Sequence, residues 1–130
     1  MKKLLLTTVL TLMTTTSAMA TEISTHVLDL ASGAGGSNIP VVLSKKEGQN
    51  WVKIADAKTG ENGRIKQFID NADFKSGTYQ LTFDMTAYDN GSAEPFFPEI
   101  NVIFKVDENI DHYHVPVVVS PYGYSTYRGN

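Results

Sequence analysis

The chain ends in HYHVPVVVSPYGYSTYRGN, residues 112–130, and this stretch sets the pattern for the whole fold. An apolar run, Val115–Val119, has histidines before it and tyrosines after it. The sequence Ser-Pro-Tyr-Gly at 120–123 then places Pro and Gly at the spacing of a tight reversal. β-Branched and aromatic residues on both sides favour extended backbone. The stretch therefore predicts a β-hairpin, with one strand near 111–119 and another near 123–128.

Upstream segments have the same character and are separated by short polar turns. In residues 77–84, Tyr79, Leu81 and Phe83 fall on one face and polar residues on the other, which is the period of a half-buried strand. Residues 85–90 leave room for one helical turn only. Including the terminal hairpin, the predicted strands cover residues 23–30, 39–46, 51–57, 64–68, 77–84, 99–106, 111–119 and 123–128. About eight short strands with at most one short helix predict an all-β antiparallel sandwich.

The first twenty residues form a segment of a different kind. Met1-Lys2-Lys3 is positively charged, residues 4–13 are mostly apolar, and Ala18-Met19-Ala20 is a small-x-small cleavage sequence. This is the pattern of a secretory signal peptide, and the apolar part is too short to span a bilayer. We therefore expect cleavage after Ala20, a periplasmic location, and a single mature domain over residues 21–130.

Composition narrows the partners that this domain can have. The signal peptide holds two of the eleven basic residues and none of the fourteen acidic ones, so nine basic residues remain against fourteen acidic and the formal charge is −5. An acidic domain without a basic stripe is a poor candidate for binding nucleic acid. The chain has no cysteine. Its stability must therefore come from core burial, which oligomerisation can supplement, and not from disulfides.

A few side chains could carry chemistry. His112 and His114 are two residues apart in a predicted strand, so both point to the same face. His26 is the third histidine of the chain, and Arg64 follows an Asn-Gly turn. These residue types allow three interpretations: a zinc site built on His-x-His and a distant His, metal-free acid–base hydrolysis with an arginine that holds an anionic or carbonyl-rich substrate, or a purely structural role. The pattern alone leaves all three open.

Several motifs together resemble one enzyme family. HYHVP at 112–116 and SPYGYSTYRG at 120–129 are similar to the signature of the 5-hydroxyisourate hydrolases, the transthyretin-related enzymes of urate breakdown. STHVLD at 24–29 resembles the N-terminal histidine strand of that family, KTGENGR at 58–64 its arginine segment, and PFFPEI at 95–100 its Phe-Phe-Pro-Glu run. The resemblance covers nearly all of residues 23–129.

The resemblance implies a transthyretin fold, with two four-stranded sheets and one short helix, and a homotetramer with active sites between dimers. It implies hydrolysis of 5-hydroxyisourate to 2-oxo-4-hydroxy-4-carboxy-5-ureidoimidazoline without metal or cofactor. By match to the motifs, the catalytic residues would be His26, Arg64 and His114. His26, Arg64, Tyr127 and Arg128 would bind the substrate, and His112 matches the first histidine of the terminal motif.

The chain departs from the family pattern at its last residue. The hydrolases end in Tyr-Arg-Gly followed by Ser or Thr, whereas this chain ends in Asn130. Asparagine keeps a small polar side chain beside the terminal carboxylate, so we expect the chemistry to survive. The alternative from another functional class is a non-enzymatic, transthyretin-like periplasmic carrier of a planar small molecule. That alternative keeps the fold and does not need the His and Arg side chains.

Overall fold

The computed structural model describes residues 11–14, 20–70, 72–91 and 94–130. The predicted signal peptide, residues 1–20, lies for the most part outside these residues. The elements run in the order β1 Glu22–Asp29, β2 Ala34–Gly35, β3 Pro40–Glu47, β4 Asn50–Lys58, β5 Arg64–Ile65, β6 Gly77–Asp84, the 3₁₀ turn η1 Met85–Ala87, β7 Glu99–Val106, β8 His112–Ser120 and β9 Gly123–Thr126. In the described part of the chain, no helix has the length and apolar character needed to cross a bilayer.

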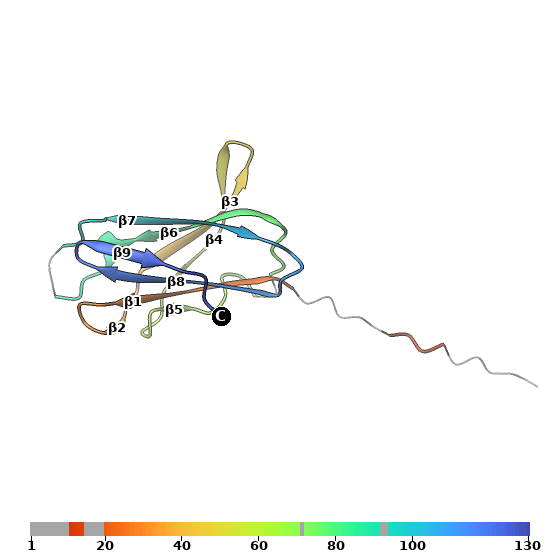
Figure 1. The fold of residues 1–130 in the computed structure, drawn as a ribbon, viewed down its shortest axis with the longest axis horizontal. Helices are drawn as coiled ribbons and strands as arrows, with labels where there is room; N and C mark the ends of the chain where they lie inside the picture. Colours follow the sequence, from red (N-terminus) through yellow and green to blue (C-terminus); the bar gives the residue numbers. More distant parts are fainter. Residues whose placement is uncertain (1–10, 15–19, 71, 92–93) are drawn as a thin grey trace, which may run out of the picture.

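The strands form two sheets that pack face to face (Figure 1). One sheet has the order β4-β3-β6-β7, and the other has the order β2-β1-β8-β9, with β5 paired to β1. The hairpin of β3 and β4 extends beyond the rest of the sandwich (Figure 1). The prediction of an all-β sandwich is therefore confirmed, but the resemblance implied two four-stranded sheets, and the short strand β5 gives one sheet a fifth strand.

One strand pair differs from the antiparallel pattern. β1 and β8 run parallel, with Ser24 opposite His114 and Glu22 opposite His112. The alternation of side chains indicates which face a strand buries, but it does not indicate the direction of a strand that pairs with it from far along the chain. This pairing places the first predicted strand beside the histidine strand, and it therefore positions the site.

The core lies between the sheets and is built from alternate strand residues. Tyr79, Leu81 and Phe83 of β6 are buried, as their alternation predicts. They meet side chains of the other sheet, among them Val117 and Val119 of β8. Burying one large apolar side chain contributes about 1.5–3 kcal/mol. The side chains of β1 and β8 that alternate with the buried ones point to the outer face of the sandwich.

Three element boundaries differ from the prediction by more than one residue. The predicted strand 64–68 ends after Ile65, and Phe68 packs against the core instead of continuing along the sheet edge. The last strand ends at Thr126, so Tyr127 and Arg128 follow it and do not belong to it. The helical turn is limited to Met85–Ala87, where Asp84 caps its start by accepting a hydrogen bond from the Thr86 amide.

Candidate active site

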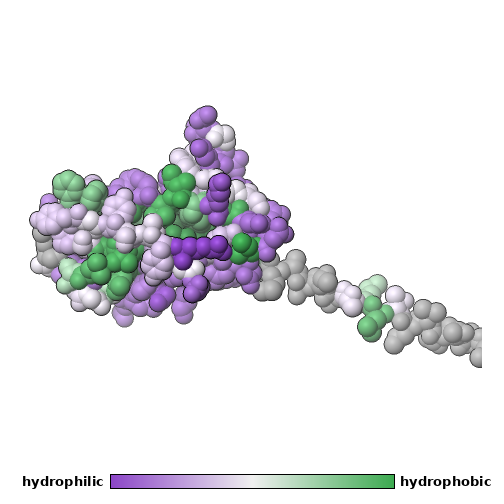
Figure 2. Space-filling view, viewed as in Figure 1, coloured by the Kyte–Doolittle hydropathy of each residue, from purple (hydrophilic) through white to green (hydrophobic). Residues whose placement is uncertain are grey.

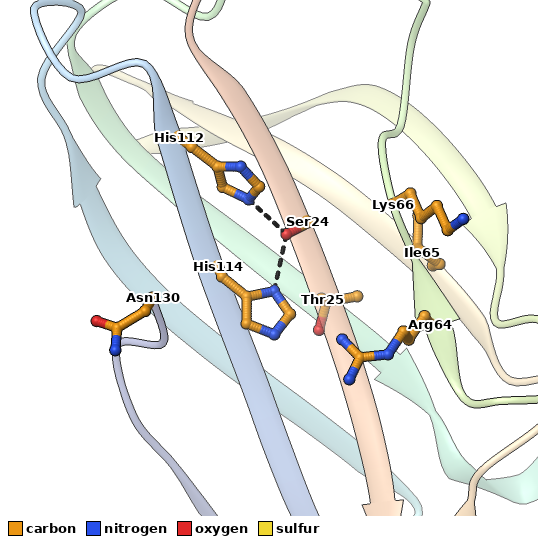
Figure 3. Close-up of a pocket in the computed structure, with 8 residues that line it drawn as sticks. All are labelled: Ser24, Thr25, Arg64, Ile65, Lys66, His112, His114 and Asn130. Carbon is orange, nitrogen blue, oxygen red and sulfur yellow. Dashed lines mark hydrogen bonds between the residues drawn. The ribbon is translucent and has the colours of Figure 1, made fainter.

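A hollow of about 250 Å³ opens on the outer face of the sheet that contains β1 and β8. Four segments of the chain contribute to it: β1, the chain around β5, β8 and the C-terminus (Figure 3). Its lining residues are Ser24, Thr25, Arg64, Ile65, Lys66, His112, His114 and Asn130. The volume lies just below the range of about 300–1,000 Å³ that is usual for ligand sites, which suits a small ring compound.

Ser24 joins the two histidines of β8. Its hydroxyl oxygen lies 2.8 Å from Nε2 of His112 and 2.7 Å from Nδ1 of His114. Figure 3 shows both rings on the same side of β8, directed toward Ser24 on β1. The prediction that His112 and His114 share a face is therefore confirmed. The parallel register of β1 and β8 supplies Ser24, a contact that the residue spacing alone did not indicate.

His26 lies two residues beyond Ser24 on the same face of β1. Its Nε2–H donates to the carbonyl oxygen of Asn62 over 3.1 Å. This bond leaves the lone pair on Nδ1 when the ring is neutral. His26 does not line the hollow itself, but it is close enough to Arg64 and His114 to interact with both electrostatically.

Arg64 is held at the edge of β1 by a tightly packed turn. It pairs with His26 in the β5–β1 ladder, and its amide donates to Oδ1 of Asn62 over 3.0 Å. Gly63 has φ +78°, and a Cβ at this position would lie 2.3 Å from the carbonyl oxygen of Val27. Only glycine tolerates both this φ and this approach. The Asn-Gly-Arg sequence therefore fixes where the guanidinium leaves the backbone.

The surroundings of His26 and His114 favour the neutral form of both rings. Burial is the largest effect that lowers the pKa of His114 below its ordinary value of 6.5, and the charges of Arg64, His112 and His26 lower it further. Burial and then Arg64 lower the pKa of His26, although the hydrogen bond to Asn62 opposes them. A neutral imidazole with a free lone pair can act as a general base near neutral pH.

The C-terminus closes one side of the hollow. The Gly129 amide donates to the His114 carbonyl oxygen over 2.8 Å, which brings Asn130 to the pocket. Tyr127 and Arg128 do not line this pocket. Both line a separate hollow against β7, where the Arg128 guanidinium lies 5.2 Å from the centre of the Tyr113 ring. Of the six predicted residues, the fold thus brings Arg64, His112 and His114 into the pocket, with His26 beside it.

The family model described as "HIUase/Transthyretin family" matches residues 23–129. The chain belongs to this family. The resemblance inferred from the sequence motifs is thereby confirmed.

Members of the HIUase/Transthyretin family match over most of their length. The 5-hydroxyisourate hydrolase of Pseudomonas aeruginosa is 40% identical over 115 residues, which cover 84% of this chain and 91% of that protein. The 5-hydroxyisourate hydrolase of Salmonella typhimurium is 35% identical, with full coverage of both chains. Among solved structures, the Klebsiella pneumoniae 5-hydroxyisourate hydrolase has a TM-score of 0.72 at 33% identity and covers 85% of this chain and 100% of its own.

Transthyretin itself has the same fold. The Sparus aurata transthyretin structure has a TM-score of 0.76 at 27% identity and covers 83% of this chain and 96% of its own. Hydrolases and transthyretin therefore share one scaffold within the HIUase/Transthyretin family, and the fold alone does not select between them. The function must therefore be inferred from the side chains that line the pocket.

The side chains around the pocket indicate which chemistry it can support. Within the described residues, no group of three or more His, Asp or Glu side chains is arranged to hold a metal ion. The residue pattern did not single out Ser24 or Lys66 as site residues. The one sequence signal for Ser24 is its place two residues before His26, on the same strand face. What the pocket offers is an oriented neutral imidazole beside a guanidinium.

Proposed function

We propose that the protein hydrolyses 5-hydroxyisourate to 2-oxo-4-hydroxy-4-carboxy-5-ureidoimidazoline. One observation carries the proposal: the pocket brings the imidazole of His114, whose pKa is lowered, next to the Arg64 guanidinium. The names of the relatives, which are 5-hydroxyisourate hydrolases in both bacteria and animals, support the choice of substrate. This chemistry needs a general base, a group that polarises a carbonyl and a proton donor for nitrogen.

In the proposed mechanism, His114 accepts a proton from water as the water oxygen attacks C6 of the substrate. The guanidinium of Arg64 donates hydrogen bonds to the substrate oxygens and stabilises the charge that develops on the carbonyl oxygen. The C6–N1 bond then breaks, and N1 receives a proton from His114. His26 lies beside both groups and acts on them electrostatically from outside the pocket. The mechanism uses no metal and no cofactor.

We further propose that the enzyme works as a homotetramer. β7 and β9 are sheet edges with unpaired backbone groups, and such edges favour pairing with another chain. Figure 2 shows apolar side chains over the region of these two strands. Ile103 and Tyr127 are each 59% exposed there, which is typical of a surface that a partner covers. Tyr127 and Arg128 would contact the substrate, as the family motif implies, only when a neighbouring subunit presents them.

Export is part of the same proposal. The charged, apolar and small-residue sequence of residues 1–20 supports cleavage after Ala20 and a periplasmic enzyme. N-terminal sequencing of protein released by osmotic shock tests it, and we expect Thr21 as the first residue. Cytoplasmic protein that retains Met1 would contradict this part of the proposal without affecting the assignment of the reaction.

The hydrolase proposal is tested by following the absorbance of freshly generated 5-hydroxyisourate. We expect wild type to exceed the spontaneous decay rate, and His114→Ala and Arg64→Glu to lose nearly all of that excess while remaining folded by circular dichroism. Lys53→Ala, on the exposed strand β4, is the matched control and should keep full activity. Binding without turnover would indicate the carrier instead. Stoichiometric metal together with loss of activity in chelator would indicate a metal enzyme.

A further inference from the structure

The hydroxyl of Ser24 can donate only one hydrogen bond, although it lies within bonding distance of two imidazole rings. The two distances are 2.8 Å to Nε2 of His112 and 2.7 Å to Nδ1 of His114. Ser24 is 5% exposed, and within the described residues its hydroxyl has no other acceptor. A buried donor without an acceptor is costly, so the hydroxyl proton must point to one of the rings. The other ring then donates its own N–H to the serine oxygen.

This arrangement links the tautomers of the two histidines. If His114 donates from Nδ1, its Nε2 carries a lone pair, and Ser24 donates to Nε2 of His112. If Ser24 instead donates to Nδ1 of His114, the proton of that ring is on Nε2, and His112 donates from its own Nε2. The first state presents a lone pair of His114 to the pocket and the second presents an N–H, which can act as an acid once His112 carries the positive charge. Hydrolysis needs both in turn.

The two rings also differ in their exposure to solvent. His114 is half-buried beside Arg64, and burial and that guanidinium disfavour its charged form. His112 is exposed at the start of β8, where water solvates a charge. Transfer through the Ser24 hydroxyl therefore moves the charge away from the half-buried ring beside Arg64 and onto an exposed ring.

We propose that Ser24 is a proton relay that passes the positive charge created on His114 by water activation to His112, and returns it when the leaving nitrogen is protonated. In the outward step, Nε2 of His114 takes a water proton and Nδ1 gives its proton to the Ser24 oxygen. The original Ser24 proton then moves to Nε2 of His112. In the return step, Nε2 of His114 gives its proton to the substrate nitrogen, and the other two transfers reverse. Every proton is accounted for within the three residues, the attacking water and the substrate.

This inference rests on the proposed hydrolase function, and it makes Ser24 and His112 positioning residues that act through His114. We expect Ser24→Ala to lower kcat by about tenfold to a hundredfold with little change in KM, because general acid–base contributions are of that order or larger. Ser24→Thr keeps a hydroxyl and should recover most of the loss. His112→Gln, at an exposed position, should lower kcat to a similar extent. Ser32→Ala, which alters an exposed serine of the loop between β1 and β2, is the matched control and should behave as wild type.

The double variant Ser24→Ala/His112→Gln separates a relay from two independent effects. Because a relay works as a unit, the double variant should lose no more than either single variant. Losses that multiply, or a wild-type kcat in His112→Gln, would overturn the proposal.

Nitrogen-15 spectra of the imidazole rings provide a readout that needs no substrate. In wild type we expect complementary tautomers, so that one ring donates to the Ser24 oxygen while the other accepts from its hydroxyl. In Ser24→Ala this constraint is lost, and the tautomer populations of both rings should change. Unchanged ring spectra in Ser24→Ala would overturn the coupling. If wild type shows no turnover above spontaneous decay, the hydrolase proposal fails and the catalytic use of the relay fails with it. The spectra would still decide whether Ser24 couples the rings.

Discussion

Gly129 lies against the imidazole ring of His114. Its amide donates to the His114 carbonyl oxygen over 2.8 Å, and the two residues form an isolated β-bridge. A Cβ built on Gly129 would be 2.6 Å from Cδ2 of that ring, which is closer than real Cβ atoms come to other atoms. The glycine before the last residue therefore serves the site by leaving room for the His114 ring.

We predict that Gly129→Ala lowers kcat by about tenfold to a hundredfold, because a displacement of a reacting group by about 1 Å can cost that much. The methyl group must push the His114 ring away from Ser24 or lift the terminus off β8. Gly123→Ala is the control, since a Cβ there meets only the Ser120 hydroxyl at 3.7 Å. Steady-state kinetics on both variants checks this prediction. Equal kcat values for the two variants would contradict it.

The extent to which the site could be predicted depended on the kind of pattern involved. The common face of His112 and His114 follows from the two-residue period of a strand, and it was correctly predicted. The contact of Ser24 with both rings depends on the parallel pairing of β1 with β8, two strands that are far apart in sequence. No local pattern specifies such a pairing. Tyr127 and Arg128 were placed in the last strand, but that strand ends at Thr126 and both line another hollow.

The pH dependence of activity should report the protonation of His114. Because the pKa of His114 lies below its ordinary value of 6.5, kcat/KM should rise with pH, with a midpoint below 6.5, and level off by neutral pH. The value of kcat/KM rises with pH because the protonated ring cannot accept a proton from water. A stopped-flow profile from acid to neutral pH, corrected for spontaneous decay, measures the midpoint. A midpoint above 6.5 would contradict this assignment of the base.

Arg64→Gln should raise the pKa of His114 toward 6.5 without reaching it. The guanidinium charge is one cause of the lowered pKa, but burial of the ring is the larger cause and remains in the variant. Titration of the His114 ring protons by NMR in both proteins measures the shift directly and does not require activity. An unchanged titration midpoint would show that Arg64 does not act on the His114 ring.

A buried carboxylate at the opposite end of β1 should contribute to stability. Asp29 is 1% exposed and accepts hydrogen bonds from the Tyr88 hydroxyl at 2.7 Å and the Ala31 amide at 2.8 Å, as well as from Asn90. Because hydrogen bonds to charged groups contribute about 1.5–3 kcal/mol, we expect Tyr88→Phe to lower the free energy of unfolding by that amount at neutral pH. Tyr122→Phe, at a residue that is 75% exposed, is the control and should change it little.

The loss in Tyr88→Phe should shrink in acid. Burial raises the pKa of Asp29, but the hydrogen bonds from Tyr88, Asn90 and Ala31 together bring it below its ordinary value of 3.8. The stabilisation by the carboxylate is therefore complete above that value and is lost as the pH falls through the lower, folded pKa. Urea unfolding at one fixed protein concentration, at neutral and at acidic pH, measures the difference. A pH-independent loss would contradict the role of the charged form.

The terminal residue offers the last test, because its backbone and its side chain can be changed separately. Asn130 lines the pocket beside His112 and His114, so Asn130→Ser exchanges one small polar side chain for another without changing the charge of the site. We expect it to change kcat by less than about threefold, since no charge moves. Removing Asn130 has a different effect, because the new carboxylate then falls on Gly129, whose backbone packs against the His114 ring. A negative charge at this position favours the imidazolium, so the pKa of His114 should rise from its lowered value and kcat/KM below pH 6.5 should fall. NMR titration of the His114 ring together with kinetics at acidic pH measures both effects. A truncated enzyme with the wild-type titration would show that the position of the terminal charge does not matter to the base.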